Sequence, residues 1–164
     1  MELSGELVGE IRQVADNYPN ARSAIMPALY LAQAQYQYLE TDVLRAVAVT
    51  LDVPEIWVFE LATFYTMYHT EPVGKYHIQL CTNVSCLLGK AEHLKQYMEE
   101  RLQIETGETT EDGKFTLSKV ECIGSCDKAP AMMVNQDYYE NLDQVFVEQI
   151  LDRLMVQSSS DQET

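Results

Sequence analysis

The chain contains four cysteines, arranged in two closely spaced pairs that could bind a metal or form disulfides. Cys81 and Cys86 enclose four residues, and Cys122 and Cys126 enclose three. Thiolates are ligands for zinc and for iron–sulfur clusters, and two thiols can also join as a disulfide. Both pairs lie in the second half of the chain, so three kinds of site have to be distinguished there.

The three kinds of site fit the spacing unequally. We expect no disulfides, because the first residues carry neither a secretory signal nor an Arg-rich transit peptide and the chain should stay in a reducing cytoplasm. Zinc accepts four thiolates, but its ligand pairs mostly enclose about two to four residues, which puts Cys81 and Cys86 at the edge of the range. A [2Fe–2S] cluster accepts wider loops because each cysteine pair serves one iron. Spacing alone favours the cluster and leaves the zinc site open.

The residues between the cysteines suit short loops that turn amide groups inward. These residues are 82–85 in the first pair and 123–125 in the second. N–H donors directed at sulfur set the reduction potential of a cluster. Gly124 suits a backbone bend that larger residues disfavour. We hypothesise that Gly124 lets its loop approach the cluster, the alternative being an ordinary turn glycine.

The spacing of the hydrophobic residues changes near residue 72, which divides the chain into a helical part and a part with strands that carries the cysteines. Up to that point hydrophobic residues recur at helical spacing and predict four short helices that form a small bundle. Ser4 and Thr41 are the expected caps of the first and third helices, and Pro54 suits the first turn of the fourth. Pro27 predicts a kink or a late start in the second helix, over residues 21–36.

After residue 72 the pattern predicts a small mixed sheet with helices on it. Tyr76, Ile78 and Leu80 alternate with polar residues, which indicates a strand over 76–81. A helix over 87–102 then leads to a second strand, which should be parallel to the first. An antiparallel hairpin should follow, and Asn141 with Gln144 resembles a capping box for a last helix. The expected strands and helices are 76–81, 87–102, 115–122, 131–134, 138–139 and 141–154.

The cysteine pairs end the two strands that should be neighbours in this sheet. The carboxyl ends of parallel strands are where α/β sheets usually place ligands. The predicted fold class is therefore α+β, with a helical bundle over residues 1–72 and a mixed-sheet α/β domain over residues 73–156. Residues 157–164 are expected to be a disordered tail.

The charge of the chain excludes several classes of partner. Lys and Arg number 11 against 26 Asp and Glu, and the formal net charge is −15. A field of that sign repels phosphate, so we expect neither nucleic-acid binding nor attraction to an anionic membrane. The longest apolar run, residues 24–32, is about half of a membrane span and contains Pro27, so no direct membrane insertion is expected.

The chain as a whole resembles a known family. The similar segments in the second half are Cys81–Cys86, Gly89, 106–108, 112–115, Glu121–Cys126 and 129–130. In these segments the chain resembles the thioredoxin-like [2Fe–2S] ferredoxins. The similar segments upstream are 18–19, 22–24, 29–33, 62–65 and 72–76. With them the chain is similar to the E-subunit family of NADH-quinone oxidoreductase, respiratory complex I, from about Tyr18 to Leu154.

The resemblance implies a thioredoxin-like second domain that carries electrons. Cys81 and Cys86 would hold one iron of a [2Fe–2S] cluster, and Cys122 and Cys126 the other. The cluster would accept an electron from FMN in a partner subunit that binds FMN and NADH. This chain should bind neither and should have no catalytic residue of its own, and it contains no Gly-x-Gly for a dinucleotide. It would be a peripheral part of a complex on the cytoplasmic face of the inner membrane.

Two other functions stay open at this point. One is a homologous diaphorase subunit of an NAD-linked hydrogenase or formate dehydrogenase. The other is a structural zinc module that organises an assembly and carries no electrons.

Some residues outside the cysteine loops also have two interpretations. Aromatic and Met side chains at Phe64, Tyr65, Met67 and Tyr68 fit either a partner interface or a contact of the bundle with the second half. We expect His69, His77 and His93 to be solvated or structural, because four cysteines already supply a full ligand set. The acidic residues Glu108, Glu111 and Asp112 are expected to form a solvated loop.

Overall fold

The computed structural model describes residues 2–160, with the side chains of residues 2–157. The chain divides between Pro72 and Val73 into two compact units. That each unit folds as a separate domain stays a prediction. Among the described residues, none of the helices combines the length and the apolar character that a bilayer span requires.

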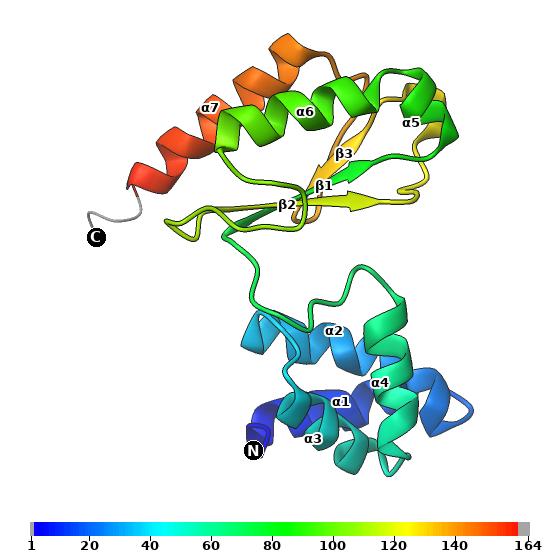
Figure 1. Cartoon of the computed structure of the whole chain (residues 1–164). Helices are drawn as coiled ribbons and strands as arrows, with labels where there is room; N and C mark the ends of the chain where they lie inside the picture. The colour runs from blue at the N-terminus through cyan, green and yellow to red at the C-terminus, as the bar shows by residue number, and fades with distance from the viewer. Residues whose placement is uncertain (1, 161–164) are drawn as a thin grey trace. The chain divides into compact units, whose positions relative to one another are not determined.

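The first unit is built from helices alone (Figure 1). They are α1 (Gly5–Ala15), the 3-10 turn η1 (Ala21–Ala24), α2 (Ile25–Tyr36), α3 (Thr41–Leu51) and α4 (Glu55–Phe64). Buried aliphatic side chains such as Ile11, Leu29 and Val47 pack between them. The hydroxyl of Ser4 accepts a hydrogen bond from the Leu7 amide at 3.2 Å, so the predicted cap of α1 is confirmed.

The first residues of α2 and α3 can be compared with the starts predicted from Pro27 and Thr41. The helix α2 begins at Ile25, after η1, and Pro27 therefore lies in its first turn, where a missing N–H costs no intrahelical bond. This confirms the expected late start. The predicted cap at Thr41 is wrong, because Thr41 is itself the first helical residue and Glu40 takes the extended cap conformation without a side-chain bond.

The second unit contains the mixed sheet that the sequence predicts. The strands are β1 (Tyr76–Cys81), β2 (Phe115–Val120), β3 (Met132–Val134) and β4 (Asp137–Tyr139), in the order β2-β1-β3-β4. The pair β1–β2 is parallel, and the pairs β1–β3 and β3–β4 are antiparallel. The α+β class is thus confirmed. The register places Cys81 opposite Val120, so both strands end at the same edge.

The helices of the second unit are α5 (Val84–Leu88), α6 (Ala91–Leu102) and α7 (Gln144–Ser160). In Figure 1, α6 and α7 lie side by side over one face of the sheet, and their buried side chains share a core with those of β1 and β2. The single helix predicted over 87–102 is divided into α5 and α6 at Gly89 and Lys90. Lys90 has a φ of 71°, which a continuous helix does not allow.

The last helix begins and ends differently from the prediction. Asp143, not Asn141, supplies the cap, since its carboxylate accepts from the Phe146 amide at 2.7 Å. Asn141 lies outside the helix with a φ of 51°. The helix α7 continues to Ser160, four residues into the segment expected to be disordered, because Gln and Ser can prolong a helix already anchored by Leu151 and Leu154. Residues 161–164 of that expected tail lie outside the described residues.

Candidate metal centre

The first cysteine segment runs from the end of β1 into α5. Cys81 is the last residue of β1, and Cys86 lies within α5. Both side chains are buried, with exposed fractions of 3% and 2%. The first turn of α5, which contains Cys86, is closed by a hydrogen bond from the Leu87 amide to the Asn83 carbonyl at 2.8 Å. A ligand held by these two thiols would be shielded from water on this side.

The second cysteine segment follows β2 and is open to solvent. Cys122 and Cys126 are exposed, and Cys126 begins the short 3-10 turn η2 (Cys126–Lys128). The Gly124 amide donates a hydrogen bond to the Cys122 sulfur at 3.4 Å. Gly124 has a φ of 82°, and no protein atom lies within 4 Å of a Cβ added there. Within the protein Gly124 is therefore needed for its backbone angle, and its approach to a cluster stays a prediction.

Backbone contacts join the two cysteine segments. The Cys81 amide donates to the Ala131 carbonyl at 3.1 Å, and the Thr82 amide donates to the Val120 carbonyl at 2.9 Å. A Cβ added at Gly89 would lie 3.0 Å from both Cγ and Cδ of the Pro130 ring. The absence of a side chain at Gly89 therefore lets the end of α5 pack directly on the segment that follows Cys126.

The thiols interact across the two segments. Burial raises the pKa of the Cys86 thiol to about 11, and a hydrogen bond with Cys81 and the nearby Cys126 add to the rise. A backbone hydrogen bond from Ala131 acts in the opposite direction. The structure thus brings Cys81 and Cys126 within electrostatic reach of Cys86. Cys122 receives its own donor from Gly124 on the exposed side.

The donor set fits an iron–sulfur cluster by its chemistry. All four cysteines are free thiols, two on each of two neighbouring segments, and amide N–H groups point at two of the sulfurs. Within residues 2–157, no three His, Cys, Asp or Glu side chains are already gathered closely enough to hold a single metal ion. The four thiols thus lie on two converging segments, with one pair on each.

The three histidines have different surroundings. His77 is buried in β1, and its Nε2 lies 2.8 Å from the Ser118 hydroxyl of β2. His69 is half-buried in the first unit, where its backbone carbonyl accepts from the Leu39 amide at 2.7 Å. His93 is exposed on α6. His69 and His77 thus have structural contacts, as expected.

Side chains in and directly after β4 hold the second cysteine segment, and the sequence pattern did not reveal them. Glu140 binds both Ser125 and Lys128, and the Tyr138 hydroxyl donates to the Ile123 carbonyl at 3.1 Å. No spacing rule connects these residues with the cysteines, because the contact depends on how the hairpin folds back. The resemblance marked Gly89 as a shared residue, but its partner Pro130 could not be predicted from the pattern.

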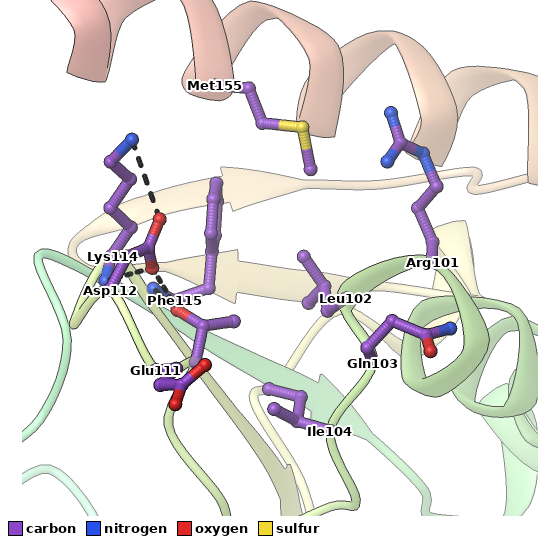
Figure 2. A pocket seen from close by; sticks show the side chains of 10 residues that line it. Arg101, Leu102, Gln103, Ile104, Glu111, Asp112, Lys114, Phe115 and Met155 are labelled. Atoms are coloured by element: carbon purple, nitrogen blue, oxygen red, sulfur yellow. Dashed lines mark hydrogen bonds and ion pairs between the residues drawn. The ribbon is translucent and has the colours of Figure 1, made fainter.

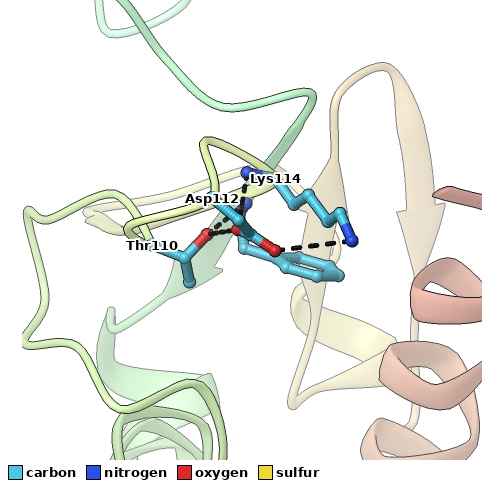
Figure 3. Close-up of polar contacts among 4 residues, drawn as sticks. Thr110, Asp112 and Lys114 are labelled. Atoms are coloured by element: carbon cyan, nitrogen blue, oxygen red, sulfur yellow. Dashed lines mark hydrogen bonds and ion pairs between the residues drawn. The ribbon is translucent and has the colours of Figure 1, made fainter. Parts of the chain in front are cut away.

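A separate hollow of about 760 Å³ lies beside the amino end of β2 (Figure 2). Its floor is apolar and includes Leu102, Phe115 and Met155. On its charged rim Asp112 forms an ion pair with Lys114 and, as Figure 3 shows, accepts from the Thr110 hydroxyl and from the Lys114 amide. These two bonds hold the pKa of Asp112 below its usual value. The hollow contains no cysteine, so it is distinct from the candidate metal centre.

Comparison with known proteins agrees with the resemblance. Residues 11–155 match the family described as thioredoxin-like [2Fe–2S] ferredoxin. Over 143 residues the chain is 52% identical to the second E subunit of the NADH-quinone oxidoreductase of Rhizobium meliloti (strain 1021), a match that covers 87% of this chain and 85% of the relative. It is 41% identical over 145 residues to the E subunit of the NADH-quinone oxidoreductase of Rickettsia prowazekii (strain Madrid E), covering 87% and 82%.

A solved structure shares the fold. The chain superimposes on part of the NAD+-reducing [NiFe]-hydrogenase in the air-oxidized state with a TM-score of 0.70 and 22% sequence identity. The match covers 84% of this chain but only 24% of that chain. The likeness confirms the architecture, a helical unit followed by a thioredoxin-like sheet, and at this identity it carries no information about activity.

Proposed function

The chain belongs to the thioredoxin-like [2Fe–2S] ferredoxin family and, within it, to the E-subunit family of NADH-quinone oxidoreductase. On that basis we propose that it is the electron-transferring subunit of an NADH dehydrogenase module. One [2Fe–2S] cluster, held by Cys81, Cys86, Cys122 and Cys126, supplies one-electron transfer when bound. The observation that carries the proposal is the convergence of two free dithiol segments at the carboxyl ends of two neighbouring parallel strands.

The residues of the chain have separate tasks at this site. Cys81 and Cys86 bury their sulfurs and keep water from one side. The exposed sulfurs of Cys122 and Cys126 place the other side at the surface, where a partner can approach. The Gly124 N–H donates to the Cys122 sulfur and stabilises negative charge there. The exposed sulfurs thus mark the side at which electron exchange with a docked protein would take place.

The electron donor in this proposal is FMN on a partner subunit that also binds NADH. The chain has no Gly-x-Gly segment for a dinucleotide. Its net charge of −15 favours docking through apolar contact or onto a basic partner surface. The complex would lie at the cytoplasmic face of the inner membrane, with this chain as a peripheral subunit.

The helical unit offers an apolar surface for that partner. On α4, Ile56 and Phe64 have exposed fractions of 67% and 76%. Of the aromatic residues with two interpretations, Tyr68 is structural, because it is buried and its hydroxyl donates to the Met26 carbonyl at 2.9 Å. Phe64 is the residue we assign to the partner interface, because large exposed aromatic side chains are typical of such surfaces.

The two alternative functions have less support. The hydrogenase match shares only 22% identity and so carries only the fold, whereas the relatives at 41% and 52% identity are both named as E subunits of NADH-quinone oxidoreductase. A formate dehydrogenase subunit has no observation in its favour. A structural zinc module is disfavoured by the family match, and metal analysis separates the two directly.

The experiment combines the chain with its electron donor. The chain is reconstituted anaerobically and treated with NADH alone, and then with NADH and the coexpressed flavin subunit. We expect the electron paramagnetic resonance signal of the reduced cluster to appear only when the flavin subunit is present. Reduction of the isolated chain by NADH would contradict the placement of NADH and FMN on the partner.

The interface is tested by Phe64→Ser, which should weaken association with the flavin subunit and leave the cluster content unchanged. Val156→Ser is the matched control, because Val156 is similarly exposed, at 72%, but lies on α7 of the other unit. Equal association of both variants and the unchanged chain would remove α4 from the interface.

A further inference from the structure

A carboxylate outside the cysteine motif holds the second cysteine segment. Glu140 directly follows β4 and uses both of its oxygens. The Ser125 hydroxyl donates to Oε1, and the Lys128 ammonium donates to Oε2 at 2.8 Å. Ser125 is buried at 8% exposure, between the exposed Cys122 and Cys126. Glu140 therefore binds the segment both between the two cysteines, at Ser125, and after them, at Lys128.

Two further contacts come from the same stretch of chain. The Tyr138 hydroxyl donates to the Ile123 carbonyl at 3.1 Å, and the Asn141 amide donates to the Lys128 carbonyl at 2.7 Å. The whole segment 123–128 is thus tied to residues 138–141. Within the segment itself, the Lys128 amide donates to the Ser125 carbonyl at 3.3 Å, a long bond.

The first cysteine segment is held in a different way. Cys81 belongs to a paired strand and Cys86 to a helical turn, which includes the bond from the Gly89 amide to the Ser85 carbonyl at 3.0 Å. Regular backbone bonds fix this segment, whereas the second segment also depends on the side chains of Tyr138 and Glu140. A change in those side chains should therefore be felt at Cys122 and Cys126 first.

The charge of Glu140 is kept under normal conditions. The Lys128 ammonium, and then the Ser125 hydroxyl, hold the pKa of Glu140 below its usual value, so the group is a carboxylate near neutrality. Its side chain is 29% exposed and that of Lys128 is 51% exposed. The ion pair is consequently partly screened by water, but the bond from the buried Ser125 is protected from it.

We propose that Glu140 is a positioning residue that holds the segment 123–128 in place and commits the Ser125 proton and the Lys128 charge to itself. This inference rests on the proposed function, because its consequence is for a cluster bound by Cys122 and Cys126. With Glu140 present, the Ser125 proton and one of the three Lys128 ammonium protons are directed at the carboxylate. Loss of the carboxylate removes a negative charge and frees both donors, and each change favours the added electron.

Two variants separate the positioning from the charge. Glu140→Gln keeps an oxygen that accepts from Ser125 but removes the charge, and Glu140→Ala removes both. Asp152→Ala is the matched control, because Asp152 also accepts from a basic side chain, Arg101 at 2.9 Å, but lies on α7 away from the cysteine segments. All variants are made in the full chain.

The first measurement is hydrogen exchange of the amides of residues 123–128 in the chain without metal. We expect exchange about tenfold faster in Glu140→Ala than in the unchanged chain, since a charged hydrogen bond is lost. Glu140→Gln should lie between them. Equal exchange in Glu140→Ala and Asp152→Ala would overturn the positioning role, and this result does not depend on cluster loading.

The second measurement uses the reconstituted chain. We expect iron release to a chelator to be about tenfold faster in Glu140→Ala, as for other residues that support metal ligands. The reduction potential should rise in both Glu140 variants and stay unchanged in Asp152→Ala. An unchanged potential in Glu140→Gln would overturn the electrostatic part. Should Glu140→Ala not fold, Glu140→Gln alone decides the proposal. An unchanged chain that takes up no iron and sulfide would overturn the proposed function instead.

Discussion

The two units of this chain differ in whether their buried side chains include polar ones. Within the described residues, all buried polar side chains lie in the second unit, and they are His77, Gln79, Thr116 and Ser125. The buried side chains of the helical unit are aliphatic or small apart from Tyr68, and further aromatic side chains such as Trp57 and Phe59 pack against them partly buried. Buried polar groups require partners and so fix one particular arrangement. In the second unit these polar contacts thus fix the arrangement of β1, β2 and the second cysteine segment, whereas apolar packing fixes the helical unit.

The surfaces of the two units differ in the same sense. In the helical unit the large exposed side chains include Ile56 and Phe64 on α4, a helix without a cysteine. In the second unit they include Leu87 and Leu88 on α5, which also carries Cys86. Both units therefore have exposed apolar side chains that could contact a partner, but only in the second unit do they lie on the same helix as a proposed cluster ligand, Cys86.

The largest effect is expected for the loss of a cluster ligand. Cys86→Ser should abolish cluster binding, because a hydroxyl is a poor replacement for a buried thiolate. Absorption spectra and iron assays after anaerobic reconstitution measure this, and far-ultraviolet circular dichroism should show an intact helical unit. The neighbouring Ser85→Ala is the control and should retain the cluster. A full complement of iron in Cys86→Ser would show that other residues hold it.

Core truncations test whether the two units are energetically separate. Leu29→Ala in α2 should lower the free energy of unfolding of the helical unit by about 2–5 kcal/mol and leave the cluster content unchanged. Met98→Ala in α6, at an equally buried position, should have a similar cost and reduce cluster retention. Denaturant titrations followed by circular dichroism and by cluster absorption distinguish the units. Loss of the cluster in Leu29→Ala would mean that they fold as one.

A smaller effect is expected where the two cysteine segments touch. Gly89→Ala places a methyl group 3.0 Å from the rigid Pro130 ring, and such overpacking costs about 1–3 kcal/mol. The cluster should also be released faster, as a chelator assay would show. Gly9→Ala is the control, because nothing lies within 4 Å of its added Cβ and helix α1 should gain about 0.5–1 kcal/mol. Release at the rate of the unchanged chain would refute the steric argument.

The smallest effect is a pH dependence of the helical unit. Burial lowers the pKa of His69 in the folded chain, whereas the unfolded chain titrates near the ordinary value of about 6.5. The unfolded state then binds more protons below that pH, so the stability of the folded state should fall as the pH is lowered through this range. Unfolding free energies at several pH values test this. In His69→Gln this part of the slope should vanish, and curves parallel to those of the unchanged chain would contradict the assignment.

Short-range patterns account for what the sequence could predict. The alternation of Tyr76, Ile78 and Leu80 predicted β1 correctly, since one face of the strand packs under α6 and α7. The parallel pairing with β2 followed from the crossover helix, and this brought the cysteine segments to one edge. The assignment to the family depended on the cysteines and the upstream segments together.

Contacts between distant residues account for what was missed. The division between α5 and α6 follows from Gly89 against Pro130 and from the positive φ of Lys90, neither of which a helical pattern contains. Caps were misplaced at Thr41 and Asn141 because several polar residues precede each helix and only the backbone angle selects one. Glu140 gave no signal, because its role exists only after the hairpin has folded.

The presence of a [2Fe–2S] cluster is decided by metal analysis and electron paramagnetic resonance of the anaerobically purified chain, before and after addition of dithionite. We expect a brown protein with two irons and two acid-labile sulfides per chain, which gives no resonance signal as isolated and the signal of one unpaired electron after reduction. A colourless protein that contains zinc, stays folded, and takes up no iron after anaerobic reconstitution would contradict this expectation.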